Sequence, residues 1–191
     1  MLKREEILRK AAKVVMCNGY ANTRLEDVAH EIGVTRPNLY YHFRSKEDLV
    51  FGVLDFVEGE FNGTCLKILE TETDPIHAIL HLVDRFTLDL ECTDYRGGCV
   101  MGALAQELAG RDEHFRQRIL RFFELIKDGV ARSLRQGQAR GYFQRPFDPE
   151  KTARWILATI QGCLLLSKTE RKREYMEACR ESILNNLQML R

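Results

Sequence analysis

The chain has 191 residues, of which 45% are hydrophobic and 30% charged, and its formal net charge is +1 at pH 7. This length allows one large domain or two small ones, and the composition indicates a globular protein rather than a disordered one. The apolar runs are too short for a membrane span. The amino terminus, "MLKREEILRK", carries no apolar signal region, which favours a cytoplasmic protein. The near-neutral charge means that any nucleic-acid binding would depend on locally placed groups.

The chain offers little of the chemistry that enzymes need. Its six cysteines are spread out without a CxxC pair, and no HExxH motif accompanies His77 and His81, so we expect reduced thiols and no metal site. A glycine-rich phosphate loop and a nucleophile elbow are also missing. The sequence therefore predicts neither an enzyme nor a cofactor.

The first fifty residues predict three short helices separated by abrupt turns. An apolar stripe over residues 7–15 indicates the first helix, and Gly19 follows it as a C-terminal cap. We expect Thr23 to cap the second helix, with Glu26 as its partner in a capping box. Thr35 offers the cap of the third, where the proline two positions later suits a first helical turn.

The rest of the chain predicts longer helices. Ser45 offers a further cap with Asp48 as its box partner, and strand signals are almost absent. We therefore expect an all-α fold, with a helix-turn-helix domain over residues 1–47 and a larger helical domain over 48–191. The helices of the larger domain are expected at about 46–70, 75–92, 99–109, 112–137, 149–168 and 171–190.

The stretch "TRPNLYYHFRSKEDL" at 35–49 predicts the function of the short helices. Two short helices joined by a turn with glycine make a helix-turn-helix, whose second helix lies in the major groove of DNA. Leu39 and Phe43 lie four residues apart and form the packed face. Tyr40, Tyr41 and His42 would then project outward, where a duplex could meet them.

The neighbouring residues suit the same role. Thr35 at a helix start is a natural phosphate seat, and Arg36 can contact phosphate or guanine. Asn38 can pair with adenine or bond to backbone, and Lys46 can reach a phosphate. The alternative is a helical module that binds small molecules or a protein partner and uses its helix-turn-helix only for packing.

Residues 5–50 resemble the DNA-binding head of the TetR family of bacterial transcriptional repressors. The matching elements are "TRLEDVAHEIGV" and "LYYHFRSKEDL", and Pro37 stands where such heads often have a small residue. The resemblance implies a repressor that binds a double-stranded DNA operator. It also implies the DNA-facing residues, which are Thr23, Arg24, Thr35, Arg36, Asn38, Tyr40, Tyr41, His42 and Lys46.

The body resembles the ligand-binding and dimerisation domain of the same family, whose last two helices form a four-helix bundle with a second copy. "ARWILATIQGCLLL" is apolar on most sides, and such a helix must be buried on both sides. A homodimer would meet this need and match a palindromic operator, whereas the alternative is intramolecular core alone. Apolar residues at helical spacing in the last helix are Met176, Cys179, Ile183, Leu187 and Leu190.

The inducer site is predicted only in outline. Phe86, Tyr95, Phe122 and Trp155 could line a small-molecule pocket or be plain core.

Residues 97–119 resemble an electrophile-responsive subgroup of the TetR family. Cys99 would begin a helix there, whose dipole favours a thiolate and lowers the thiol pKa, and Lys168 could add positive charge. These features predict an electrophile-sensing thiol, while the alternative is a small buried hydrophobe.

Overall fold

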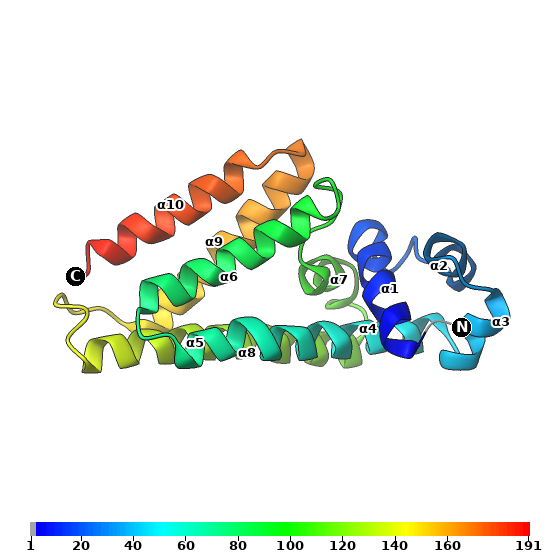
Figure 1. Ribbon diagram of the computed structural model, residues 1–191, viewed down its shortest axis with the longest axis horizontal. Helices are drawn as coiled ribbons and strands as arrows, with labels where there is room; N and C mark the ends of the chain where they lie inside the picture. Colours follow the sequence, from blue (N-terminus) through cyan, green and yellow to red (C-terminus); the bar gives the residue numbers. More distant parts are fainter. Residues whose placement is uncertain (1–2) are drawn as a thin grey trace.

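The computed structural model describes residues 3–191, and all regular elements in this range are helices (Figure 1). The head at one end consists of α1 (Arg4–Asn18), α2 (Leu25–Ile32) and α3 (Arg36–His42). The expected all-α fold is confirmed, and no helix within the described range is long and apolar enough to cross a bilayer. The remaining elements are α4 (Lys46–Phe61), η1 (Asn62–Leu66), α5 (Lys67–Thr71), α6 (Pro75–Glu91), α7 (Val100–Leu108), α8 (Glu113–Ala139), α9 (Pro149–Glu170) and α10 (Glu174–Gln188).

The head is joined to the body through α4. The apolar stripe of α1, which includes Ile7 and Val15, is fully buried. Leu49 and Val53 of α4 are equally buried, and α1 packs against this helix. The predicted domain boundary between residues 47 and 48 falls within α4, which runs continuously from the head into the body. This boundary therefore stays a prediction.

Two of the predicted caps are confirmed in atomic detail. Thr35 Oγ1 accepts a hydrogen bond from Asn38 N at 3.4 Å, and Ser45 Oγ accepts one from Asp48 N at 3.1 Å. The carboxylate of Asp48 reaches back to Arg44 N at 2.9 Å, one residue before the expected partner. These bonds satisfy backbone N–H groups that a helix start leaves free.

The predicted cap at Thr23 is wrong. Arg24 precedes α2 as its N-cap, and the Thr23 side chain is fully buried. Its hydroxyl donates to the carbonyl oxygen of Gly19 at 2.5 Å and so closes the turn between α1 and α2. A threonine hydroxyl can equally bond to nearby backbone outside a helix start, and here the turn provides the nearer partner.

The body helices follow the predicted order with two changes. The chain is helical throughout the range 46–70, as expected, but a π-helical turn over Asn62–Leu66 divides this helix into α4 and α5. The last helix begins at Glu174 rather than near 171, because Arg171 adopts a left-handed conformation (φ 54°) that ends α9. The last helix then returns antiparallel along α9 and also packs on α6 (Figure 1).

The apolar stripe of α10 faces inward. Its residues Met176, Cys179, Ile183 and Leu187 are at most 1% exposed within one copy of the chain. The interpretation of this stripe as a contact with a second copy is therefore wrong, because α6 and α9 already cover it. The exposed large apolar side chains in this part of the chain are others: Trp155, Leu165 and Leu166 on α9, and Met189 directly after α10.

An ion-pair cluster fastens α8 to α4. Glu58 is only 6% exposed, and its Oε2 accepts from Arg118 Nη1 at 2.5 Å. Arg118 also pairs with Asp55 on the same helix, whereas Arg121 lies 3.7 Å from Glu58 and is largely exposed. Arg118 is therefore the main counter-charge of a buried carboxylate.

Replacing Arg118 with Leu should lower the free energy of unfolding by about 2 kcal/mol, because it leaves the Glu58 carboxylate without its close partner. The partial exposure of Arg118 keeps this cost below that of a fully buried pair. Arg121→Leu is the matched control and should change stability by less than about 0.5 kcal/mol. Urea unfolding followed by circular dichroism measures both, and equal effects would contradict the assignment.

Candidate DNA-binding surface and effector cavities

The short helix α3 divides its side chains between the core of the head and solvent. Leu39 is fully buried, and Phe43, which follows the helix, is buried with it. Tyr41 is 76% exposed and Tyr40 45%, and Arg36 at the start of the helix is also exposed. The predicted packed face and the outward direction of both tyrosines are confirmed.

Glu26 of α2 holds two of these outward side chains in place. Its Oε1 accepts from Arg36 Nη2 at 2.5 Å and from the Tyr40 hydroxyl at 3.0 Å. Backbone hydrogen bonding, followed by the bonds from Arg36 and Tyr40, lowers the pKa of the Glu26 carboxyl. The sequence suggested only a capping partner for this residue. The interaction spans two helices, so its sole sequence signal is an acidic residue ten positions before the arginine.

Three predicted DNA-facing residues do not face outward freely. The expected DNA contact of Thr23 is wrong, because its side chain is fully buried. Two others point partly inward. Asn38 and His42 are half-buried, and Asn38 Oδ1 and His42 Nε2 have no hydrogen-bond partner among residues 3–191. The expected full outward projection of His42 is therefore wrong, although its ring lies edge-on to Tyr41 at a centroid distance of 5.1 Å. Arg24 and Thr35 are exposed as expected.

Lys46 is engaged with the turn between α1 and α2. Its ammonium donates to the carbonyl oxygen of Tyr20 at 3.1 Å and lies 4.2 Å from the centroid of the Tyr20 ring. The same ring packs edge-on against Phe115 of α8. Lys46 therefore helps to hold the head on the body, in addition to any phosphate contact.

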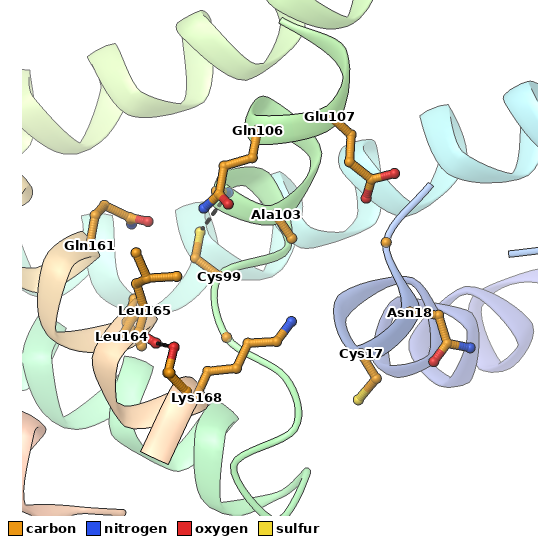
Figure 2. Close-up of a pocket in the computed structure, with 14 residues that line it drawn as sticks. Cys17, Asn18, Cys99, Ala103, Gln106, Glu107, Gln161, Leu164, Leu165 and Lys168 are labelled. Atoms are coloured by element: carbon orange, nitrogen blue, oxygen red, sulfur yellow. Dashed lines mark hydrogen bonds between the residues drawn. The ribbon is translucent and has the colours of Figure 1, made fainter. Parts of the chain in front are cut away.

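Glu107 at the end of α7 binds the backbone of the same turn. Its Oε1 accepts from Tyr20 N at 2.8 Å and its Oε2 from Ala21 N at 2.7 Å. Figure 2 shows its side chain directed from α7 toward the end of α1. The partners lie more than eighty positions apart in the chain, and no local sequence pattern could have revealed the contact.

Beside this contact lies a junction cavity of about 390 Å³ between the end of α1, α7 and α9. Cys99 and Lys168, which the sequence analysis singled out, both line it, and Lys168 reaches across from α9 (Figure 2). As predicted, Cys99 begins a helix, where its Sγ accepts from Gly102 N at 3.4 Å.

The expected low pKa of Cys99 is wrong. The side chain is buried, and desolvation raises the pKa of its thiol despite the hydrogen bond from Gly102. The free-energy cost of removing the thiolate from water exceeds the stabilisation that a hydrogen bond from one N–H group at the helix start provides.

A second, apolar cavity of about 210 Å³ lies between α1 and the body helices α4, α6, α7 and α8. Phe86 and Phe122, both predicted pocket residues, line it together with Phe56 and Phe61. Its polar groups include the ion pair of Arg85 and Asp89, and burial raises the pKa of the Asp89 carboxyl. Residues 9–16 of α1 contribute one wall, so the cavity touches the head directly.

Two predicted pocket residues lie elsewhere. Trp155 is 37% exposed on the outer side of α9, and Tyr95 sits in the turn after α6 with a φ of 57°. Neither lines the apolar cavity or the junction cavity. Aromatic residues in a helical pattern can face a pocket, the core or a partner, and sequence spacing does not separate these cases.

A helix-turn-helix with an exposed second helix, joined to a helical body with cavities beside the junction, indicates a DNA-binding regulator that responds to ligands. Comparison with known families agrees with this class. Residues 7–53 match the family described as "Bacterial regulatory proteins, tetR family", and residues 75–183 match "Tetracyclin repressor-like, C-terminal domain". The chain therefore belongs to the TetR family of DNA-binding transcriptional regulators.

Individual relatives are distant. The chain is 28% identical over 174 residues to the HTH-type transcriptional repressor DhaR of Mycobacterium sp. (strain GP1), which covers 91% of this chain and 86% of the relative. Its fold is similar to that of the regulatory protein TetR from Rhodobacter sphaeroides, with a TM-score of 0.86, 18% identity and coverage of 97% and 98%. A TetR regulator from Legionella pneumophila gives a TM-score of 0.84 at 22% identity, with 98% of each chain covered.

Burial and raised pKa predict that Cys99 reacts slowly with alkylating reagents. Timed treatment of the folded protein with iodoacetamide at pH 7.5, followed by peptide mass spectrometry, should label the exposed Cys92 first. Cys99 should become as reactive as Cys92 only in denaturant. Labelling of Cys99 ahead of Cys92 in the folded protein would restore the interpretation of an activated thiol.

Proposed function

We propose that the protein is a dimeric repressor, active in the cytoplasm, that leaves a palindromic operator when a small molecule occupies the apolar cavity. The observation that carries this proposal is the pair of exposed tyrosines beside Arg36 on α3, which Glu26 holds in a fixed arrangement. The relative DhaR is named a transcriptional repressor, which favours repression over activation.

The DNA contacts would divide by chemistry. Arg36 can pair bidentately with guanine, whereas the Tyr40 hydroxyl and Thr35 at the helix start suit phosphate oxygens. Tyr41 offers its ring to sugar or to a thymine methyl group. Side chains that are already fixed lose less conformational entropy on binding, so the hold of Glu26 on Arg36 favours affinity.

The dimer would form through the outer face of α9. Trp155, Ala158, Gly162 and Leu165 recur at spacings of three and four residues and are all exposed. A side chain added at Gly162 would meet no atom of the same copy, so this position leaves room for a close second helix. An apolar stripe of this kind, with small residues at its centre, suits a two-fold contact with a second copy.

The inducer would be a small molecule with an aromatic or apolar body and one polar group. Four phenylalanines line the apolar cavity, and the Arg85–Asp89 pair is available at its polar side. Because residues 9–16 of α1 form one wall, an occupant that needs more room pushes on the head directly. Reversible occupation of this cavity is favoured over attack at Cys99, whose thiol pKa is raised by burial.

Substitutions on α3 should separate affinity from base preference. Tyr41→Ala should weaken operator binding roughly tenfold without loss of stability, because the side chain packs little on the head. Arg36→Ala should cost about 1–3 kcal/mol and relax the base preference at one position of each half-site.

The measurement is a gel shift at several salt concentrations with DNA from upstream of the coding region, whose half-sites should lie about 34–36 Å or a multiple apart. Leu88→Ala, an exposed change on α6, is the control and should leave binding unchanged. Unaltered binding by both α3 variants would overturn the assigned surface.

Charge on the outer face of α9 should break the dimer. Leu165→Glu should give a folded monomer by light scattering, with loss of operator binding, because the side chain is 49% exposed within one copy. Ile183→Glu should instead lower the unfolding temperature, since this residue is fully buried within one copy. A stable dimer of the Leu165 variant would exclude this face as the interface.

A further inference from the structure

The carboxylate of Glu107 on α7 accepts hydrogen bonds from backbone N–H groups of the head. Among the hydrogen bonds of residues 3–191, no other side chain of α7 does so. Both carboxylate oxygens accept, each from a different N–H group of the turn between α1 and α2. Hydrogen bonds from N–H groups to an ionised carboxylate are about twice as strong as those between neutral groups. This pair therefore ties the orientation of the head to the position of α7.

The head is shaped to receive this carboxylate. Gly19 ends α1 with a φ of 72°, a conformation that side chains rarely adopt. A Cβ atom at this position would overlap Glu107 Oε1. Glycine is therefore needed here for two reasons: it allows the turn, and it leaves space for the carboxylate.

The same turn is held from two further directions. Lys46 of α4 donates to the Tyr20 carbonyl, and Phe115 of α8 packs on the Tyr20 ring. Tyr20 thus receives contacts from α4, α7 and α8. Among these, Glu107 differs because it also lines the junction cavity, together with Cys99, Ala103 and Gln106 of the same segment (Figure 2).

We propose that Glu107 is a positioning residue for operator binding: it fixes the head, and with it the recognition helix α3, on the body. This inference rests on the proposed function as a repressor and names a contact on which operator binding depends. With both carboxylate bonds in place, the two heads of a dimer keep one separation. Without these bonds, the two heads sample several separations.

This role predicts a specific pattern of DNA binding. An operator with two half-sites requires both heads at one separation, whereas a single half-site requires only a folded head. Loss of the Glu107 bonds should therefore weaken binding to the full operator but not to the half-site. A variant that merely unfolded the head would weaken both.

The test uses the full-length protein and three duplexes: the operator selected by the wild type from random DNA, the same operator with one base pair inserted between its half-sites, and a single half-site. Glu107→Ala should bind the full operator roughly tenfold more weakly and should discriminate less against the inserted base pair. Its affinity for the single half-site should equal that of the wild type. The affinity of Glu107→Gln for the full operator should lie between those of Glu107→Ala and the wild type, because glutamine keeps one acceptor oxygen.

Gln106→Ala is the matched control, because Gln106 lines the same cavity and its side chain is exposed. It should behave as the wild type on all three duplexes. Hydrogen exchange provides a second readout, in which the amides of Tyr20 and Ala21 should lose protection only in the Glu107 variants.

The outcomes separate the two levels of the proposal. A wild type that selects no DNA would overturn the proposed function itself. A wild type that binds, with a Glu107→Ala variant that matches it on every duplex, would overturn the positioning role alone. Equal losses on the operator and the half-site would show that Glu107 supports only the fold of the head.

Discussion

The position of the recognition helix depends on how the turn after α1 is held. Apart from the buried Thr23, this turn has little side-chain core of its own, because Gly19, Ala21 and Asn22 offer almost nothing to bury. Its place is set instead by the Tyr20 backbone and ring, which receive a carboxylate, an ammonium group and an aromatic edge from three body helices. Polar contacts of this kind depend steeply on geometry, so small movements of the body weaken them.

Helix α1 belongs to the head and to the body at the same time. One face packs with α2 and α4, and another closes the apolar cavity. The end of the same helix lines the junction cavity, and Gly98 and Cys99 line both cavities. An occupant of either space therefore meets the helix that carries the DNA-binding turn. Coupling between ligand and DNA needs such a shared element with different contacts in the two states.

Local sequence patterns predicted local features well. Thr35 and Ser45 cap helices as expected, and Leu39 turns inward just before two outward tyrosines, because these features depend on neighbours within four residues. Thr23 shows where this reasoning ends. Its hydroxyl could bond either to the start of α2 or to the preceding turn, and in the structure it bonds to the carbonyl oxygen of Gly19 in that turn. The apolar stripe of α10 is a similar case, since spacing predicts a buried face but not which helix covers it.

The sequence by itself determined the all-helical fold, the order of the helices and the outward tyrosines of α3, since periodicity and caps are set within single turns of the chain. Tertiary structure decided what distant residues do to one another. Glu26 accepts hydrogen bonds from Arg36 and Tyr40, and Glu107 accepts them from the backbone of the head. Cys99 is a desolvated thiol with a raised pKa. The physical reason is that hydrogen-bond partners and desolvation depend on which helices meet, and contacts across many residues leave no periodic trace in the chain.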